Sequence, residues 1–405
     1  MTDLEQFRRA TRAWLLENCP PSQRTTVAKQ DVVWPGRNQT FPSEDARLWF
    51  ERMRDKGWTC PTFPAEYGGG GLDEAQEKVL REEMQDLGCR PPVIDQGISM
   101  LGPALLEFGN EAQKAYHIPK IVRGELRWCQ GYSEPGAGSD LASLQTKCEP
   151  FDDHFLVNGS KIWTSYGVES DWIFCLVRTS NEGAKQAGIS FLLIDMESPG
   201  VKAESIDLIS GESEFAQVFF DNVKVPKENL VGEINQGWAV AKGLLKHERK
   251  MMAELGTGFA GGDLSLAKIA EQQFGRDAAG QIDQPEIRLA IADYEMNMRA
   301  IALTGQRSHE EAQAGQMDRN VPLIMKYVGT TAVQTRDELA MDIQGYRSAG
   351  WHDENFSVSE LRTARDLLFN KALTIAGGTN EIQLNIIAKR ALGLPDAPAP
   401  DKEER

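Results

Sequence analysis

Apolar residues recur at helical spacing near both ends of the chain and at strand-like spacing in the middle. Residues 1–125 predict a helical domain, because apolar positions there recur every three or four residues, as in the expected helices at 74–87 and 98–108. The intervening Gly and Pro clusters are typical of turns between helices.

The pattern changes at residues 126–235, which carry short β-rich runs without helices of βαβ length between them. This region therefore predicts an antiparallel β domain. Asn158-Gly159 lies between two strand-like runs, 155–157 and 160–163, and predicts a hairpin with a type I′ turn.

Helical spacing returns over residues 236–394 and predicts a C-terminal helical domain, whereas the polar, Pro-rich residues 395–405 predict a flexible tail. Helices are expected at 285–311, 322–344, 357–376 and after Asn380, where Gln383 has the position of a capping-box residue. The whole chain is thus predicted to be an α+β protein.

Composition narrows the class of function. The chain has 405 residues, and 44 Lys+Arg against 60 Asp+Glu give a net charge of −16, which argues against a nucleic-acid or anionic-membrane surface. No apolar run reaches the roughly 20 residues of a membrane span. Six scattered cysteines and an N-terminus without a signal-peptide core predict free thiols and a cytoplasmic location, and the five histidines have no metal-ligand spacing.

Glu248 is the strongest candidate for chemistry. It lies in the gap of an apolar helix stripe, three residues after Leu245 and four before Met252. A carboxylate among apolar neighbours loses hydration, and its pKa rises toward the range of a general base. The alternative is a solvated helix glutamate beside other charged residues.

Four Gly-rich or aromatic motifs are candidate binding sites, and each has a structural alternative. Gly256–Gly261 matches G-x-G-x-x-G, but a charged helix precedes it where a dinucleotide site needs a buried strand, so small-residue helix packing is favoured. Tyr132–Asp140 offers hydroxyls and Gly backbone at the start of the β region, or is a polar turn. Trp163 in Lys161–Ser165 is either core or the cover of a planar cofactor. Ala376–Gln383 joins a Gly turn to a helix N-terminus suited to a pyrophosphate, or is a plain cap.

Taken in order, these segments resemble the acyl-CoA dehydrogenase family. The resemblance spans the chain to about residue 394 and is carried by motifs in sequence order: Gly57–Gly69, Phe108–Lys114, Pro119–Glu125, Tyr132–Asp140, Lys161–Ser165, Phe220–Pro226 and Gly377–Gln383. It implies an N-terminal helical domain, a middle β domain and a C-terminal four-helix bundle. It further implies FAD, an acyl-CoA substrate that is α,β-dehydrogenated, a homotetramer and an electron-transfer flavoprotein as acceptor.

The resemblance also implies which residue is the base. One family position for it is Gly377 here, which has no side chain, and the other is the Glu of Glu248-Arg249 on the first helix of the C-terminal domain. The branch that uses this second position favours branched, long or bulky acyl groups, an analogy only.

Further roles follow from the same resemblance. Tyr132 and Ser133 would contact the isoalloxazine, and Trp163 and Ser165 would cover its other side. Ser139 would reach the pyrophosphate or the pantetheine arm of the substrate. Thr379 and Glu381 are expected near the adenosine half of FAD, and Leu245 near the acyl-CoA. Arg249 is expected near the pantetheine arm, with a structural ion pair as the alternative. The stretch 91–100 is expected to line part of the acyl pocket, with ordinary core packing as the alternative.

Two departures from the family pattern leave alternatives open. Glu271 stands where the family has an Arg for the FAD pyrophosphate, so Arg276 is a candidate substitute. The segment around Gln344-Gly345 matches the family's Gln-x-x-Gly-Gly pattern only in part. The alternatives are a flavin-poor partner subunit of a mixed tetramer, or an oxidase or desulfinase of the same fold.

Overall fold

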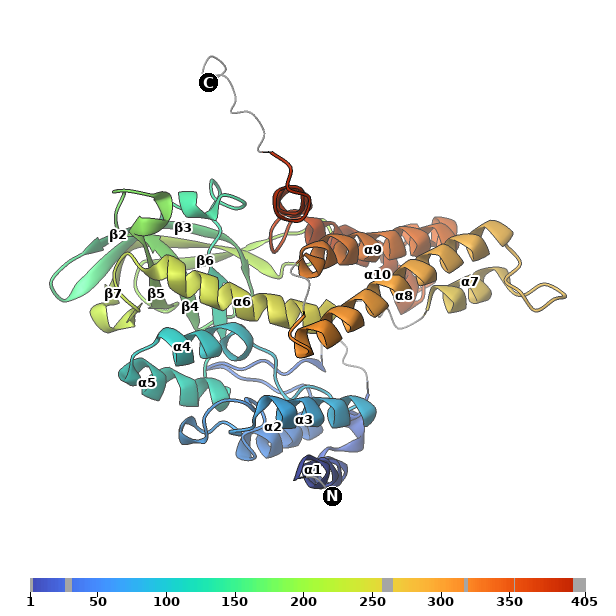
Figure 1. Ribbon diagram of the computed structural model, residues 1–405, viewed down its shortest axis with the longest axis horizontal. Helices are drawn as coiled ribbons and strands as arrows, with labels where there is room; N and C mark the ends of the chain where they lie inside the picture. The colour runs from blue at the N-terminus through green and yellow to red at the C-terminus, as the bar shows by residue number, and fades with distance from the viewer. Residues whose placement is uncertain (1–2, 26–30, 257–264, 317–319, 353, 396–405) are drawn as a thin grey trace, which may run out of the picture. The chain divides into compact units, whose positions relative to one another are not determined.

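The computed structural model describes residues 3–25, 31–256, 265–316, 320–352 and 354–395, except for the side chains of 248–256, 309 and 322. The chain divides into two compact units (Figure 1). The first comprises residues 1–206 and 213–251, and the second comprises 207–212 and 252–405.

The first unit begins with helices whose ends are set by local capping. Asp73 and Asn110 each form a capping box at the start of a helix, with Gln76 and Gln113 as partners. A π-helical turn at Gly97–Leu101 precedes the fourth helix. The helices are α1 (Asp3–Asn18), α2 (Glu44–Asp55), α3 (Glu74–Asp86), α4 (Gly102–Phe108) and α5 (Glu111–Val122).

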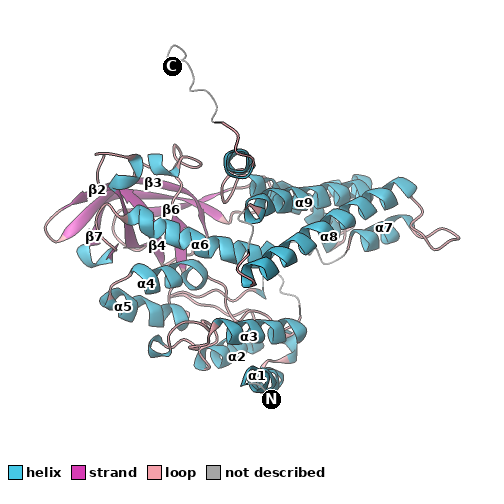
Figure 2. Cartoon of the chain, in the orientation of Figure 1, coloured by secondary structure: helices cyan, strands magenta, loops and turns pink. Residues whose placement is uncertain are grey.

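The strands follow the helices and form a single sheet, drawn in magenta in Figure 2. Within the described residues the strands are β1 (Trp128–Gly131), β2 (Lys147–Pro150), β3 (His154–Ser165), β4 (Trp172–Arg178), β5 (Ile189–Asp195), β6 (Val201–Ile206), β7 (Phe215–Pro226) and β8 (Leu230–Val231). Their order is β6-β7-β3-β2-β4-β5-β8, with β1 also paired to β4. Most pairs are antiparallel, as predicted, but β1 and β2 run parallel to β4.

The predicted Asn158-Gly159 hairpin is wrong. Both residues lie inside β3, which pairs with β7 along its length and with β2 on its other side. Asn158 exchanges hydrogen bonds with Asn222 of β7, where the ladder shifts register. Gly159 has φ +145°, and a Cβ there would lie 2.8 Å from the Thr146 Cα. The dipeptide therefore serves a bulge and a close backbone approach, which use the same residue types as a turn.

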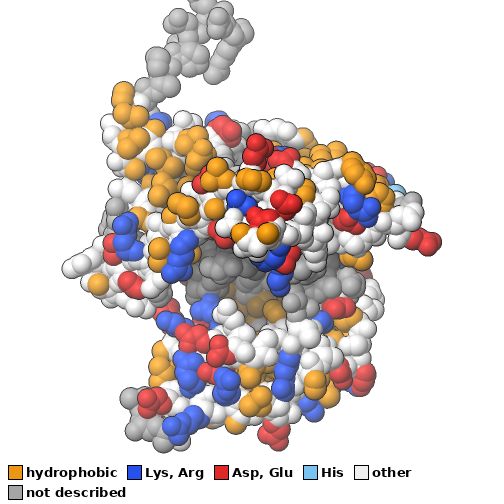
Figure 3. Space-filling model, turned by 90° about the vertical axis from the view of Figure 1, so that its right-hand side faces the viewer, with side chains coloured by type: hydrophobic (Ala, Val, Ile, Leu, Met, Phe, Trp, Pro, Cys, Tyr) orange, Lys and Arg blue, Asp and Glu red, His pale blue; other side chains and the backbone are white. Residues whose placement is uncertain are grey.

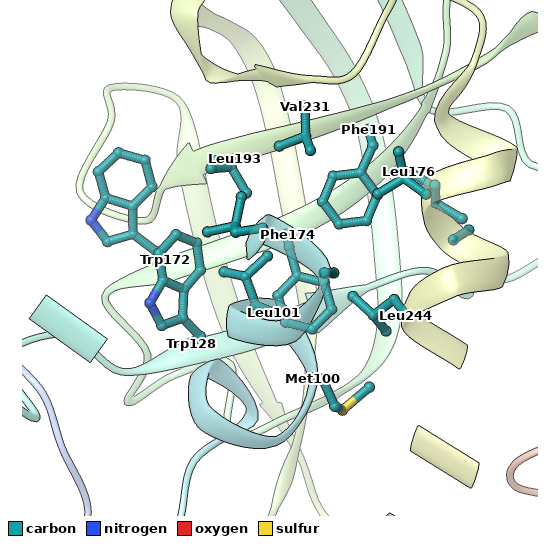
Figure 4. Packing of buried hydrophobic residues seen from close by; sticks show 14 of the residues in the cluster. Met100, Leu101, Trp128, Trp172, Phe174, Leu176, Phe191, Leu193, Val231 and Leu244 are labelled. Carbon is teal, nitrogen blue, oxygen red and sulfur yellow. The ribbon is translucent and has the colours of Figure 1, made fainter. Parts of the chain in front are cut away.

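A hydrophobic core lies between the sheet and the helices α4, α5 and α6 (Gly237–Gly256). Figure 4 shows Leu101 and Leu244, from the helical side, close to the strand residues Phe174, Leu176 and Phe191. All five side chains are fully buried. A second cluster, built from Val157, Val218 and other strand residues, fills the opposite face of the sheet.

The second unit is helical. Its helices are α7 (Leu266–Phe274), α8 (Pro285–Gln313), α9 (Val321–Gln344), α10 (Val358–Asn370) and α11 (Asn380–Ile386), and α9 contacts each of the other four. The third predicted helix ends six residues early, at Asn370, where a 3₁₀ turn begins. The capping box predicted from Asn380 is wrong, since the N-cap is Thr379 and its side chain accepts from the Ile382 N–H. The α+β class, with helical, β and helical parts in that order, is confirmed.

Candidate active site

The turn after β1 and the end of β3 lie side by side. The Ile162 N–H of β3 donates to the Ser133 carbonyl oxygen at 2.9 Å. Two predicted cofactor contacts, the Tyr132–Ser133 pair and the Trp163–Ser165 segment, therefore meet at one place in the first unit. Sequence spacing alone does not bring them together, because about 30 residues separate them.

Trp163 is exposed by a local distortion of β3. The ladder between β3 and β7 shifts register between Lys161 and Thr164, and Trp163 adopts φ +60°. This left-handed conformation is costly for a residue with a Cβ, and such strain gathers at functional sites. As a result the indole is 55% exposed, while the next side chain, Thr164, is fully buried. The bulge thus presents a large flat ring at the surface, as a planar ligand requires.

A buried ion pair supports this turn, and the sequence motifs did not single it out. The Lys161 ammonium group, fully buried, donates to Glu134 Oε1 at 2.7 Å and to the Tyr132 carbonyl oxygen at 3.2 Å. Glu134 also accepts from the backbone N–H groups of Gln145 and Thr146. Burial works against the charged carboxylate, but Lys161 and these donors outweigh it and lower the pKa of Glu134.

The turn after β1 and the end of β3 fit a flavin on two counts. The Ser133, Ser139 and Ser165 hydroxyls form no hydrogen bond with any residue that the structure describes, so they are available to a ligand. A Cβ at Gly136 or Gly138 would meet no atom within 4 Å, which leaves their backbone open to close approach. Neither glycine has a positive φ, so their contribution is open space for a ligand rather than an unusual backbone conformation.

Helix α6 carries the predicted base at backbone position 248. Val240, Ala241 and Leu244 form its buried face, and Leu245 is partly buried beside them. Position 248 is one turn after Leu244, so it continues the same face of the helix. The side chains of Glu248 and Arg249 lie outside the described residues.

A close helix crossing fixes α6 against α4. A Cβ at Gly243 would lie 2.4 Å from the Phe108 ring, so only glycine allows this approach. Near the same end, His247 Nε2 lies 3.9 Å from Glu107 Oε2. This crossing therefore fixes the backbone of α6, which carries position 248, against α4.

The predicted acyl-pocket stretch, 91–100, is anchored by Asp95. Its carboxylate accepts from the Gly97 N–H at 2.7 Å and the Trp128 N–H at 3.2 Å, and burial raises its pKa to about 7. Beside it, Gln96 Oε1 and Gln130 Nε2 are buried without a hydrogen-bond partner among the described residues. Unpaired buried amide atoms cost free energy unless a water or ligand completes them.

The other predicted cofactor residues belong to the second unit. Gly377 and Gly378 have positive φ and lead into α11, whose N-cap is Thr379. The pKa of Glu381 is lowered by the helix N-terminus, first by its own N–H. The Arg276 guanidinium donates to both carboxylate oxygens of Glu271, at 2.8 and 2.9 Å. Its predicted pyrophosphate contact therefore competes with an acid of its own unit.

Two absences apply to the part of the chain that the structure describes. No group of three or more His, Cys, Asp or Glu side chains there is arranged to hold a metal ion. No helix there combines the length and apolar character needed to cross a membrane. All six cysteines are buried and unpaired.

Comparison with known proteins identifies the class and then the family. Three domain families match in order: acyl-CoA dehydrogenase, N-terminal domain, over residues 1–125; middle domain, over 129–223; and C-terminal domain, over 235–392. The chain is 37% identical to the acyl-CoA dehydrogenase IpdE1 of Mycobacterium tuberculosis over 98% of this chain and 99% of that protein. The protein is an oxidoreductase. It belongs to the acyl-CoA dehydrogenase family.

Solved structures agree with this assignment. A steroid acyl-CoA dehydrogenase, Tcur3481-Tcur3483, superimposes with a TM-score of 0.75 at 27% identity over 97% of this chain and 98% of that one. The ChsE4-ChsE5 complex of Mycobacterium tuberculosis gives a TM-score of 0.73 at 27% identity over 98% of this chain and 99% of that chain. Each of these two proteins carries the names of two gene products.

Proposed function

We propose that the protein is an FAD-dependent dehydrogenase that converts an acyl-CoA thioester to the 2-enoyl-CoA. The observation that carries this proposal is the proximity of Tyr132–Ser133 to an exposed, strained Trp163 at the bulge of β3. Free Ser133 and Ser165 hydroxyls near Trp163, and the open backbone of Gly136 and Gly138 in the turn after β1, would supply the polar contacts that an isoalloxazine ring needs.

In this proposal Glu248 takes the α-proton of the thioester. Its backbone position supports this role, because it lies one turn beyond the buried Leu244 and continues the same face of α6. The bound flavin supplies the hydride-accepting N5 atom. Ser133 and Ser165 orient the ring through their hydroxyls, and Trp163 shields it from water.

The experiment compares the purified enzyme with Glu248→Gln under anaerobic conditions. We expect a yellow protein whose flavin is bleached by acyl-CoA, and a rate about 10²–10⁴-fold lower in the variant, the usual range for removing a general base. Glu233→Gln, at an exposed position just before α6, is the matched control and keeps the rate. Bleaching by Glu248→Gln at the original rate would exclude Glu248 as the base.

We also propose a bulky acyl group that carries polar atoms. The similarity to a steroid acyl-CoA dehydrogenase supports the bulk, and the unpaired Gln96 Oε1 and Gln130 Nε2 support the polarity. Rates with a dye acceptor over straight, branched and oxygenated cyclic acyl-CoA thioesters test this. A preference for plain straight chains would contradict it.

The proposed assembly is a tetramer, homomeric or mixed. On α8, Leu289, Met296 and Leu303 recur every seven residues and are 65%, 69% and 47% exposed, an apolar stripe typical of a helix–helix interface. The Glu271–Arg276 pair and the two-component relatives favour a mixed tetramer as the second candidate. The proposed electron acceptor is an electron-transfer flavoprotein, as the family membership implies.

A further inference from the structure

A cavity of about 580 Å³ opens in the first unit, and none of the residues assigned above lines it. Its walls are the loop of residues 34–40 before α2, the start of β1 and the segment 167–171 that follows β3. Neither the proposed dehydrogenation nor the family assignment gives this cavity a role.

Arg127 lies at the cavity wall, which also carries Arg37 and the acids Glu169, Asp171 and Glu197. Its side chain lies over two aromatic rings, with the guanidinium carbon 4.2 Å from the Trp34 ring centre and 5.0 Å from that of Tyr166. The residue is 8% exposed, and its backbone N–H donates to Asp171 Oδ2 at 2.8 Å. The rings hold the guanidinium in place but accept none of its in-plane N–H groups.

Within the described chain, no residue accepts a hydrogen bond from this guanidinium or forms an ion pair with it. The other arginine of the cavity, Arg37, is held instead by Asp195 and Glu197. A cation that is more than nine-tenths buried is costly unless its donors are satisfied. Burial lowers the pKa of Arg127, and the charge of Glu169 is the largest influence against that lowering.

We propose that this cavity binds a small oxyanion, a carboxylate or a phosphate, whose two oxygens accept the free N–H groups of Arg127. A planar guanidinium matches two co-planar oxygens bidentately, and the rings restrict its orientation before the ligand arrives. The cavity volume accommodates a molecule well beyond a single ion. This inference does not depend on the proposed dehydrogenase reaction.

The test is isothermal titration of the purified full-length protein with inorganic phosphate and with acetate, at constant ionic strength set by chloride. We expect saturable binding of at least one anion. Arg127→Gln weakens it about tenfold or more, because charge-assisted hydrogen bonds are lost. Glu169→Gln, which removes the competing negative charge, tightens it about twofold. Binding of phosphate alone indicates a phosphate ester as the ligand class, and binding of acetate alone indicates a carboxylate.

Arg123→Gln is the matched control, because its guanidinium is exposed and paired with Glu125; it leaves binding unchanged. Arg127→Lys keeps the positive charge but loses the two parallel N–H donors of the guanidinium, so we expect weaker binding. This variant remains informative if Arg127→Gln does not fold. Absence of saturable binding to the unmodified protein, or unchanged affinity in Arg127→Lys and Glu169→Gln, would overturn the proposal.

Discussion

Lys161 carries a charge into the core of the middle domain, where its neighbours Val157 and Val218 are apolar. Alternation along β3 places it at an inward position, and a lysine there indicates a buried acid partner. The sequence pattern therefore predicts an acidic partner for Lys161 but does not identify which residue it is. Glu134 is 27 residues away and is brought to 2.7 Å only by folding.

Lys161→Met leaves Glu134 buried and unpaired and removes the donor to the Tyr132 carbonyl oxygen. We expect the free energy of unfolding to fall by about 3 kcal/mol, within the range for broken buried pairs, and the protein to retain less flavin on purification. Denaturant unfolding and the flavin-to-protein absorbance ratio measure the two effects.

Two further variants distinguish a support for flavin from a general loss of stability. Glu134→Gln combined with Lys161→Met removes both charges and recovers stability while flavin retention stays low. Lys147→Met breaks an exposed pair with Glu149 and changes neither measurement appreciably. Full flavin content in Lys161→Met would contradict the supporting role.

Asp95 makes stability depend on pH. Because its pKa is raised to about 7 in the folded protein, the folded state keeps a proton that the unfolded chain loses near pH 4. The stabilisation by this proton is present below pH 4 and is lost as pH rises to 7, by up to about 1.4 kcal/mol per pH unit.

Asp95→Asn lacks this titration, so the stability of the variant relative to the unmodified protein increases as pH rises from 4 to 7. Unfolding of both proteins across that range tests it. Burial lowers the pKa of His117 to about 4, which gives stability the opposite dependence on pH. This contribution is the same in both proteins, so it cancels when their free energies of unfolding are subtracted. A constant difference would contradict the raised pKa of Asp95.

At the scale of elements, the helices were predicted best where a periodic apolar pattern met a clear cap. The expected helix 74–87 is α3, Glu74–Asp86, with Asp73 as its cap. The element predictions failed where residue types serve two structures, as at Asn158-Gly159, or where a cap was placed one residue late, as at Asn380. Local composition does not separate a bulge from a turn, because both use the same glycine and asparagine conformations.

The crossing of α4 and α6 predicts a clash for Gly243→Ala. Its Cβ meets the Phe108 ring, so we expect the free energy of unfolding to fall by about 1–2 kcal/mol despite the better helix propensity of alanine. Adding Phe108→Leu relieves the contact and restores part of the loss. Gly305→Ala on α8, whose Cβ meets only the Met325 Cε at 3.6 Å, is the control and raises stability slightly. Gly243→Ala melting like Gly305→Ala would exclude the close crossing.

At the scale of the whole molecule, charge and apolar surface point to different behaviour. Figure 3 shows acidic and basic side chains interspersed with hydrophobic ones on the face it presents. The net charge of −16 favours a dispersed protein, yet α8 exposes Leu289, Met296 and Leu303 along one stripe. A covering helix from another subunit would bury this stripe.

Met296→Glu places a charge in the middle of the stripe. We expect the dissociation constant of the proposed tetramer to rise at least about tenfold, since burial of one such side chain contributes about 1.5–3 kcal/mol. Light scattering after size exclusion over a dilution series measures the mass. Asn297→Glu adds the same charge at an adjacent exposed position and leaves the mass unchanged. An unaltered mass for Met296→Glu would place the interface elsewhere.

The sequence by itself determined the order of helical, β and helical parts, because apolar periodicity reports which face of each element is buried. It also singled out Trp163, Ser133 and Glu248 as residue types suited to the chemistry. Only the tertiary structure decided the exposure of Trp163, the Glu134–Lys161 pair and the unpaired state of Arg127. These three features depend on backbone strain or on contacts between residues distant in the chain. The local pattern of apolar and polar residues reports neither of these causes.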